Sequence, residues 1–441
     1  MSNPPPSLPA GVRDFLPRAA ARRRGLADAV MAVFDSWGYS RIVTPAFEVA
    51  DVLERGLGKD ARAAAIRFVE PGTGQIVALR PDITPQVARV VATRMRDVPR
   101  PLRLSYEGAV MRMSTGLGQR ELMQAGIELM GAQSPDGDAE VLALASAVLR
   151  ATKLPEVALA RLDVGHVAPV KFVIAACDAA DGVKDGPTAQ AVTAALARKD
   201  RAGLARAASG LAPTVAKLAQ DLATLWGPTD EVFARVWGQS WPDEVAVQLS
   251  ELRTIIAAYQ QLAQHPIEVR LDLGDVRGFE YYTAMRFAGY VDGAPDAVLR
   301  GGRYNDLLGR FGAAEPAVGF GVDIEAIAQA QKNAGIALPK SPLGILLISE
   351  RAAAAPIAHA LREHGLRAVV AAPSLVPDVA AAQAYLAAHN LQAALFFATA
   401  QLLRASADSA ITVAAVPIVV RAQLTAALAG DANPIISTLN A

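Results

Sequence analysis

Apolar residues recur at helical spacing near the N-terminus of the chain and alternate with polar residues further on. The stretch "RAAARRRGLADAVMAVFDSWG" has a helical period that ends at Gly38 and predicts a helix, and "YSRIVTPAFE" predicts a strand broken by Pro45. "QIVALRPDITPQVARVVATRM" predicts a strand that ends near Arg80 and a helix capped by Thr84, with Pro85 at its first position. The residues between them, "RPDIT", are therefore expected to form a turn.

Two β-like segments follow, "LRLSYEGAVMRM" and "RELMQAGIELMG". They flank the short polar loop "STGLGQ", which predicts a β-hairpin. Because side chains alternate along a strand, Leu122, Gln124, Gly126 and Glu128 share one face of the second segment. Two polar side chains on one face of an otherwise apolar strand mark Gln124 and Glu128 as candidate functional residues.

The rest of the chain changes pattern twice. From about Val170 to Gln264 it is alanine-rich and helical, and Trp226, Trp237 and Trp241 are expected to pack this region. Strands return in "IEVRLDLG", "FEYYTAMRFAGY" and "EPAVGFGV", and after Leu343 short strands alternate with alanine-rich helices. We expect a core formed by residues 1–165 and 266–335, a helical insertion at 166–265 and a small α/β domain at 342–441.

Composition narrows the function. Lys+Arg and Asp+Glu both number 43, so net charge favours no nucleic-acid partner. The start "MSNPPPSLPAG" lacks the pattern of a signal peptide, and no apolar run reaches the roughly 18 residues of a membrane helix, so we expect a cytoplasmic protein. The single cysteine, Cys177, excludes an internal disulfide and is expected to be an inert core thiol. The five histidines lack metal-ligand spacing, so neither a metal nor a cofactor is expected.

Polar residues in the turn and the hairpin predict a site for a cation. Asp82 and Thr84, together with Gln124 and Glu128, would provide two carboxylates and two neutral polar groups, which suit an ammonium group and a polar side chain. The alternative is that Glu128 forms an ion pair with an arginine such as Arg120 or Arg277. The pattern leaves both interpretations open.

Three further stretches carry candidate ligand groups. In "DVRGFEYYTAMRF", Arg277 precedes Tyr281 and Tyr282, and adjacent tyrosines on a strand would point to opposite faces, so that only one lines a given pocket. "LRGGRYNDLLG" places Tyr304 after two glycines, which is typical of a turn that approaches a ligand. Arg112, at the end of a strand, would bind a carboxylate or phosphate, or be a solvated charge.

In order and spacing these motifs resemble the class II histidyl-tRNA synthetase family from about Leu8 to Ala330. "PAGVRDFLP" resembles the N-terminal signature, and "GYSRIVTPAFE" resembles motif 1, whose proline, Pro45 here, lies at a dimer interface in that family. "LRPDITPQVAR" resembles the turn that holds the histidine amino group, which assigns this role to Asp82 and Thr84. The resemblance implies an α+β fold, an antiparallel sheet flanked by helices. The other residues implied to bind histidine are Arg112, Gln124, Glu128, Arg277, Tyr281, Tyr282 and Tyr304.

Two departures from the synthetase pattern concern ATP. Arg112 is followed by Met113, Ser114 and Thr115, where synthetases have an acidic residue and further arginines. In "PAVGFGVDIEAI", which resembles motif 3, Ala326 stands where synthetases have an arginine for the ATP phosphates. Without these cations adenylate formation should be strongly impaired.

A retained histidine pocket beside a degraded ATP site resembles the regulatory subunits of ATP phosphoribosyltransferase, which are synthetase paralogues of histidine biosynthesis. The resemblance implies a non-catalytic subunit that assembles with a short-form catalytic subunit, is required for its activity, and mediates feedback inhibition by histidine. The alternative is a divergent histidyl-tRNA synthetase in which Arg120 or Arg303 takes over ATP binding. A scaffold without a ligand is disfavoured because the amino-acid residues are retained.

Overall fold

The computed structural model describes residues 7–113, 119–154, 159–337, 344–363, 365–396 and 401–404. The chain divides into two compact units, Met1–Leu338 and Pro339–Ala441, which we describe separately. No helix within the described ranges is long and apolar enough to cross a membrane. The expected hairpin loop at residues 114–118, with Ser114 and Thr115, and also His364 lie outside these ranges.

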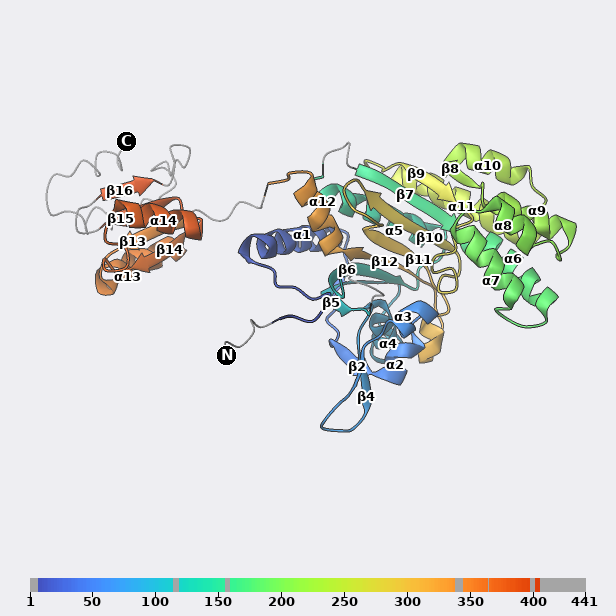
Figure 1. Cartoon of the computed structure of the whole chain (residues 1–441), viewed down its shortest axis with the longest axis horizontal. Helices are drawn as coiled ribbons and strands as arrows, with labels where there is room; N and C mark the ends of the chain where they lie inside the picture. Colours follow the sequence, from blue (N-terminus) through green and yellow to red (C-terminus); the bar gives the residue numbers. More distant parts are fainter. Residues whose placement is uncertain are drawn as a thin grey trace, which may run out of the picture. The chain divides into compact units, whose positions relative to one another are not determined.

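A nine-stranded sheet forms the centre of the first unit (Figure 1). Its central strands pair antiparallel, whereas β1 pairs parallel with β5, and β7 pairs parallel with β9. Helices flank the sheet, which confirms the expected α+β fold. In sheet order the strands are β1 (Ser40–Arg41), β5 (Leu102–Met111), β6 (Glu121–Met130), β12 (Ala317–Asp323), β11 (Leu299–Arg303), β10 (Met285–Val291), β7 (Leu159–His166), β9 (Val269–Asp272) and β8 (Trp226–Pro228).

Three helices pack against one another and the sheet. They are α1 (Pro17–Ser36), α5 (Asp136–Ala151) and α12 (Ile324–Asn333). Helix α1 buries Leu26, Val30 and Phe34, which recur every four residues and so lie on one face. The ring of Phe34 meets that of Phe320 on β12 edge to face, with the centroids 5.9 Å apart. Burial of this apolar stripe explains why the predicted N-terminal helix forms.

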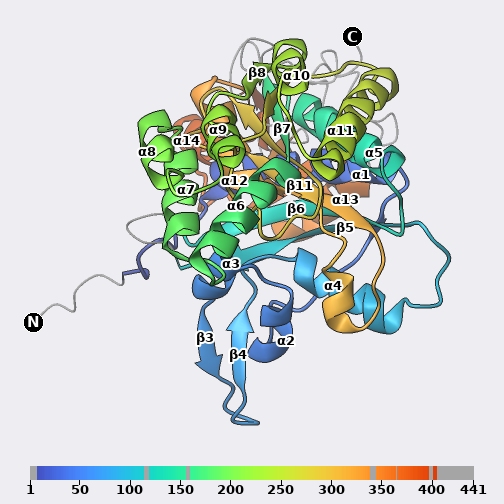
Figure 2. The same cartoon turned by 90° about the vertical axis from the view of Figure 1, so that its right-hand side faces the viewer.

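A smaller three-stranded sheet lies beside helix α4 (Thr84–Arg94). Its order is β2 (Phe47–Val49), β4 (Ile76–Leu79), β3 (Arg67–Val69), and α2 (Ala50–Arg55) and α3 (Lys59–Ala63) connect β2 to β3. Figure 2 shows β3 and β4 extending away from the large sheet. Thr84 is the first residue of α4 rather than its cap: Ile83 takes the cap position, and the Thr84 hydroxyl is bonded elsewhere.

Helices α6 to α11 form most of the stretch expected as an insertion. Helix α11 packs against α5, and β8, between α9 and α10, joins the edge of the large sheet, so this region shares the core of the first unit. Trp241 is buried as expected, but Trp226 and Trp237 are 53% and 42% exposed, which corrects their expected packing role. The helices are α6 (Val167–Asp181), α7 (Pro187–Ala197), α8 (Arg201–Ala207), α9 (Pro213–Leu222), α10 (Thr229–Trp237) and α11 (Asp243–Leu262).

The second unit is a small α/β structure over the residues described. Strands β14 (Arg367–Ala371), β13 (Gly344–Ile348) and β15 (Ala393–Phe396) are parallel, and β16 (Gln401–Arg404) is antiparallel to β15. Helices α13 (Arg351–Glu363) and α14 (Val379–His389) alternate with the parallel strands, and two apolar clusters are buried within the unit. The alternation agrees with the pattern that the sequence predicts.

Candidate functional site

A cavity of about 760 Å³ opens in the first unit. Its walls come from the turn at 81–85, from β6, β11 and β12, and from the turn at 277–282. Eight of the nine residues that the sequence assigns to histidine binding border this cavity. They are Asp82, Thr84, Arg112, Gln124, Arg277, Tyr281, Tyr282 and Tyr304.

Asp82 and Gln124 meet at the cavity wall. Asp82 Oδ1 accepts hydrogen bonds from Gln124 Nε2 at 2.9 Å and from the Ile83 amide at 2.7 Å. The second carboxylate oxygen has no hydrogen-bond partner among the described residues, and Asp82 forms no ion pair there. This arrangement presents a carboxylate oxygen to a ligand that donates.

Glu128, the ninth residue, lies behind the cavity wall. It is 1% exposed, and its Oε1 accepts hydrogen bonds from the hydroxyls of Thr84 at 2.6 Å and Tyr106 at 3.2 Å, while its Oε2 accepts from the hydroxyl of Tyr304. Burial, with a smaller contribution from the charge of Asp82, raises the pKa of this carboxyl well above its usual value. Glu128 has no arginine partner among the described residues, so the ion-pair interpretation with Arg120 or Arg277 is wrong.

Gly319 borders the cavity and lies against the Glu128 carboxylate. A Cβ at this position would lie 2.1 Å from Glu128 Oε2, so only glycine leaves the carboxylate in place. Gly319 pairs with Glu128 across β12 and β6. Any residue with a Cβ at position 319 would therefore displace the Glu128 carboxylate.

Both Tyr281 and Tyr282 border the cavity, which corrects the expectation that only one of them can. Strand β10 begins at Met285, and the preceding residues form a turn in which Gly278 has φ +70° and the amides of both tyrosines bond to its carbonyl. The Tyr281 ring meets the Tyr282 ring edge to face at 5.2 Å and lies 5.5 Å from the Tyr304 ring. The Tyr281 hydroxyl is buried without a hydrogen-bond partner among the described residues.

The cavity's arginines are held by neighbouring groups. Arg112 Nε donates to the Pro81 carbonyl at 2.7 Å. Arg277 pairs with Asp275 at 2.8 Å and donates to the Tyr290 hydroxyl at 2.9 Å. Arg286 shares Asp275 at 2.8 Å, and these two cations hold the pKa of Asp275 well below its usual value despite burial.

Neither of the other two arginines considered from the sequence lines the cavity. Arg303 is buried against Asp138, with Nη2 to Oδ2 at 2.5 Å, and it also donates to the Ala132 carbonyl. Arg303 is therefore not free to bind ATP phosphates. Arg120 joins Arg112 through its backbone, at the base of the hairpin.

The acidic turn after β12 has structural partners. Asp323 Oδ1 accepts from the Ala326 amide at 2.9 Å and caps α12. Glu325 accepts from the Met123 amide at 2.6 Å and lies 2.6 Å from Arg23 of α1. These contacts explain why the turn reads Asp-Ile-Glu-Ala: its two acids fix the start of α12 against β6 and α1.

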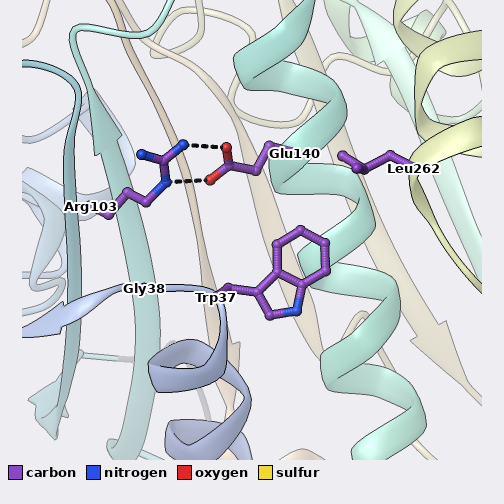
Figure 3. Close-up of a pocket in the computed structure, with 5 residues that line it drawn as sticks. All are labelled: Trp37, Gly38, Arg103, Glu140 and Leu262. Atoms are coloured by element: carbon purple, nitrogen blue, oxygen red, sulfur yellow. Dashed lines mark hydrogen bonds and ion pairs between the residues drawn. The ribbon is translucent and has the colours of Figure 1, made fainter.

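A second, smaller cavity of about 370 Å³ lies where α1, β5, α5 and α11 meet (Figure 3). Arg103 and Glu140 form a bidentate ion pair in its wall, with 2.9 and 2.6 Å between the atoms, and the Tyr39 hydroxyl also donates to Glu140. Trp37 and Leu262 complete the wall. Because Arg103 and Glu140 neutralise each other, this cavity presents fewer charged groups to a ligand than the larger cavity does. No group of three or more metal-ligating side chains occurs in the part of the chain that the structure describes.

The Histidyl-tRNA synthetase family model matches residues 11–327 of the chain. A protein of Anaeromyxobacter dehalogenans (strain 2CP-1), named ATP phosphoribosyltransferase regulatory subunit, is 42% identical over 330 residues, which cover 74% of this chain and 91% of the relative. The chain belongs to the family of ATP phosphoribosyltransferase regulatory subunits. The relatives are named as regulatory subunits, and that name implies a catalytic partner for those proteins.

Family members also match beyond the first unit. The Moorella thermoacetica regulatory subunit is 35% identical over 401 residues, which cover 89% of this chain and 98% of that protein. A solved structure from Bacillus halodurans, an ATP phosphoribosyltransferase regulatory subunit/histidyl-tRNA synthetase, has a TM-score of 0.74 at 25% identity and covers 90% of this chain and 99% of that one. The family's synthetase-like fold is thus the fold of this chain.

Proposed function

We propose that this regulatory subunit binds free histidine in the 760 Å³ cavity and transmits its occupancy to a short-form ATP phosphoribosyltransferase catalytic subunit. The observation that supports it is a pair of carboxylates, Asp82 and Glu128, with hydrogen-bond donors around them but no ion-pair partner among the described residues. Carboxylates in a closed site without a cation favour a ligand that brings N–H groups or positive charge. Histidine brings both, an ammonium group and an imidazole.

Asp82 and Glu128 lie at different depths, which favours the binding of different ligand groups by the two carboxylates. Asp82 faces the cavity with a free oxygen and, with Gln124, suits the strongly hydrated ammonium group. Glu128 lies deeper, beside the hydroxyls of Thr84 and Tyr304, and suits an N–H of the flat imidazole, which Tyr281 and Tyr282 border with their rings. Arg112 borders the cavity beside the same turn, where its Nε donates to the Pro81 carbonyl, and its guanidinium suits the ligand carboxylate.

We propose that the subunit has no adenylation activity. Phosphate binding in such a site needs cations that are free to approach the ligand. Three arginines that border the cavity already have carboxylate partners: Arg277 and Arg286 pair with Asp275, and Arg300 pairs with Asp296. Ala326 occupies the motif 3 position and brings no charge.

We further propose a homodimer built on the segment around Pro45. Large apolar side chains are exposed beside it, including Val43 at 79% and Phe47 at 46%. Exposed apolar side chains grouped in this way are typical of an interface. Histidine bound to one arrangement of the hetero-oligomer in preference to another would provide the feedback signal.

Calorimetric titration of the full chain with histidine tests this proposal. We expect binding that Asp82→Asn weakens by about 10-fold or more, because a hydrogen bond to a charged group contributes roughly 1.5–3 kcal/mol. Asp296→Asn is the matched control: Asp296 borders the same cavity but pairs with Arg300, and its change should leave affinity within about twofold. Equal losses in both variants, or no binding by the wild type, would contradict the proposed site.

Two assays separate the regulatory role from a synthetase. Histidine-dependent exchange of pyrophosphate into ATP should be absent, because the cavity arginines are engaged. Addition of the chain to a short-form catalytic subunit should raise phosphoribosyltransferase activity, and histidine should reverse the increase. Exchange at the rate of a genuine synthetase would instead establish an aminoacylation enzyme.

A further inference from the structure

Arg80 immediately precedes the turn that carries Asp82, and its guanidinium is buried without a carboxylate. Its Nε donates to the Ala109 carbonyl on β5 at 2.8 Å, and its Nη1 donates to the Thr44 carbonyl at 2.9 Å and the Thr44 hydroxyl at 3.1 Å. Arg80 forms no ion pair with any described residue, and burial lowers its pKa. The free-energy cost of burying the guanidinium charge is therefore offset by hydrogen bonds to acceptors on two segments distant in sequence, at Thr44 and at Ala109.

The backbone of Arg80 forms two more hydrogen bonds, one to each of these segments. Its amide donates to the Ala46 carbonyl at 3.1 Å, and its carbonyl accepts from the Met111 amide at 2.9 Å. Because Asp82 follows two residues later, one residue links the cavity turn to the stretch Thr44–Ala46 through both side chain and backbone. A shift of the turn therefore disturbs several hydrogen bonds at once.

A second route joins the cavity to the same stretch. Gln86 lies two residues after Thr84 on α4 and is 1% exposed. Its Oε1 accepts from the Thr44 hydroxyl at 2.9 Å, and its Nε2 donates to the Pro45 carbonyl at 2.9 Å and to Glu48 at 3.0 Å. The polar network thus extends from the cavity to β2.

The far end of this network carries the exposed apolar face. Phe47 and Val49 on β2 share one face of the small sheet with Phe68 on β3, and the Phe47 and Phe68 rings meet edge to face at 5.7 Å. The register joins these strands through β4, with Phe47 opposite Leu79, the residue before Arg80. This is the small sheet that extends from the large one in Figure 2.

We propose that Arg80 is a positioning residue that couples ligand occupancy of the cavity to the conformation of segment Thr44–Val49, and so to the apolar face that this segment builds. The inference rests on the proposed function, since the ligand is the one assigned to the cavity. It adds the path by which the ligand acts. A ligand held by Asp82 fixes the 81–85 turn, and Arg80 fixes Thr44–Ala46 relative to that turn. The position of β2, which comes directly after Thr44–Ala46, is then fixed as well.

Gly108 provides a way to displace Arg80 without altering its chemistry. A Cβ at Gly108 would lie 2.1 Å from Arg80 Nη2, so Gly108→Ala must push the guanidinium aside. Arg80→Lys keeps the charge but replaces the planar fork by one ammonium, which cannot reach Ala109 and Thr44 together. The two variants act on the same contacts by different means, so either one tests the route if the other fails to fold.

Hydrogen–deuterium exchange on the full chain with and without saturating histidine provides the readout. In the wild type we expect histidine to slow exchange at residues 81–85 and at residues 43–50, the latter by about fivefold or more, the lower end of typical coupling. In Arg80→Lys and Gly108→Ala the slowing at 81–85 should persist while the slowing at 43–50 disappears. A residue with a purely structural role would change the basal exchange rate but not remove the histidine response.

The matched controls are Arg96→Lys and Gly238→Ala. The Arg96 guanidinium bonds to the Ala92 carbonyl of α4 and to no other described residue, and a Cβ added at Gly238 meets nothing closer than 3.5 Å. Both should respond as the wild type does. Histidine binding without slowing at 43–50 in the wild type, or unchanged slowing in both variants, overturns the coupling alone. Absence of histidine protection at 81–85 in the wild type overturns the proposed function and this inference with it.

Discussion

Glu128 has a carboxyl group that accepts three hydroxyl hydrogen bonds and lacks a cation among its described neighbours. Burial raises the pKa of this carboxyl, so it keeps its proton at a higher pH than an exposed glutamate does. An N–H donor from a ligand favours the ionised form and therefore releases this proton. Binding and protonation at Glu128 thus oppose each other.

The first prediction concerns pH. Histidine affinity should rise as pH rises through the raised pKa of Glu128, because less free energy is then needed to remove the proton. Glu128→Gln removes the titration and should flatten the part of the slope that is not due to histidine itself, while weakening binding by about 10-fold or more. Calorimetry at several pH values, in two buffers of different ionisation enthalpy, measures both. A variant with the wild-type slope would show that Glu128 does not titrate on binding.

Tyr281→Phe is the second prediction at this scale. The Tyr281 hydroxyl has no hydrogen-bond partner among the described residues, so its removal should leave the free energy of unfolding within about 0.5 kcal/mol or raise it slightly. Histidine affinity should fall by about 3- to 10-fold if the hydroxyl bonds the ligand. Tyr259→Phe, which loses a bond to the Ile267 amide at 2.7 Å, should do the opposite: cost about 1 kcal/mol of stability and leave affinity unchanged. Urea unfolding and calorimetry on both variants separate the two roles.

The sequence predicts many residues of this site, but it does not predict which of them line the cavity and which lie behind its wall. Alternation on β6 places Gln124 and Glu128 on one face of the strand, and the turn before α4 could be located from Pro85. Tyr106 was missed because its role depends on the β5–β6 register, where it stands opposite Gly126. Both Tyr281 and Tyr282 reach the cavity because Gly278 has a left-handed backbone conformation. The alternation of side chains in the sequence cannot reveal that conformation. Long-range register and local φ decide which polar residues touch the cavity and which support it.

At the scale of elements, one buried ion pair joins α5 to β11. Arg303 and Asp138 are almost wholly buried, and desolvation raises the pKa of Asp138 although the guanidinium opposes the shift. Arg303 also holds the Ala132 carbonyl, and it directly precedes Tyr304. The pair therefore fixes both the entry to α5 and the strand end that delivers Tyr304 to Glu128.

Asp138→Ala should lower the free energy of unfolding by about 3–5 kcal/mol, since it leaves a buried guanidinium without its partner. The double variant Asp138→Leu with Arg303→Met should recover most of that loss, because no charge then remains buried. Urea denaturation gives both values. A single variant as stable as the wild type would mean that Arg303 finds another acceptor.

For the whole molecule, the two units have separate cores, and every described residue of the larger cavity belongs to the first. The Anaeromyxobacter dehalogenans relative aligns over 91% of its own length with 74% of this chain, whereas the Moorella thermoacetica relative extends further. Amino-acid binding should therefore be a property of the first unit alone.

A chain truncated after Leu338 should bind histidine with a dissociation constant within about threefold of the full chain, the additivity expected of independent parts. Calorimetry on the two proteins, after circular dichroism has shown equal thermal transitions for the first unit, makes the comparison. A truncated chain that folds but does not bind would assign part of the site to the second unit.

Cys177 is the single cysteine of the chain and lies buried on α6, where burial raises the pKa of its thiol to about 11. Thiolate is the reactive form, so maleimide and other thiol reagents should leave the native protein unmodified near neutral pH. The variant Val43→Cys, at an exposed position next to the Thr44–Val49 segment, would then carry the one reactive thiol. A fluorophore there would report histidine-dependent movement of the 43–49 segment in real time, without prior removal of a native thiol.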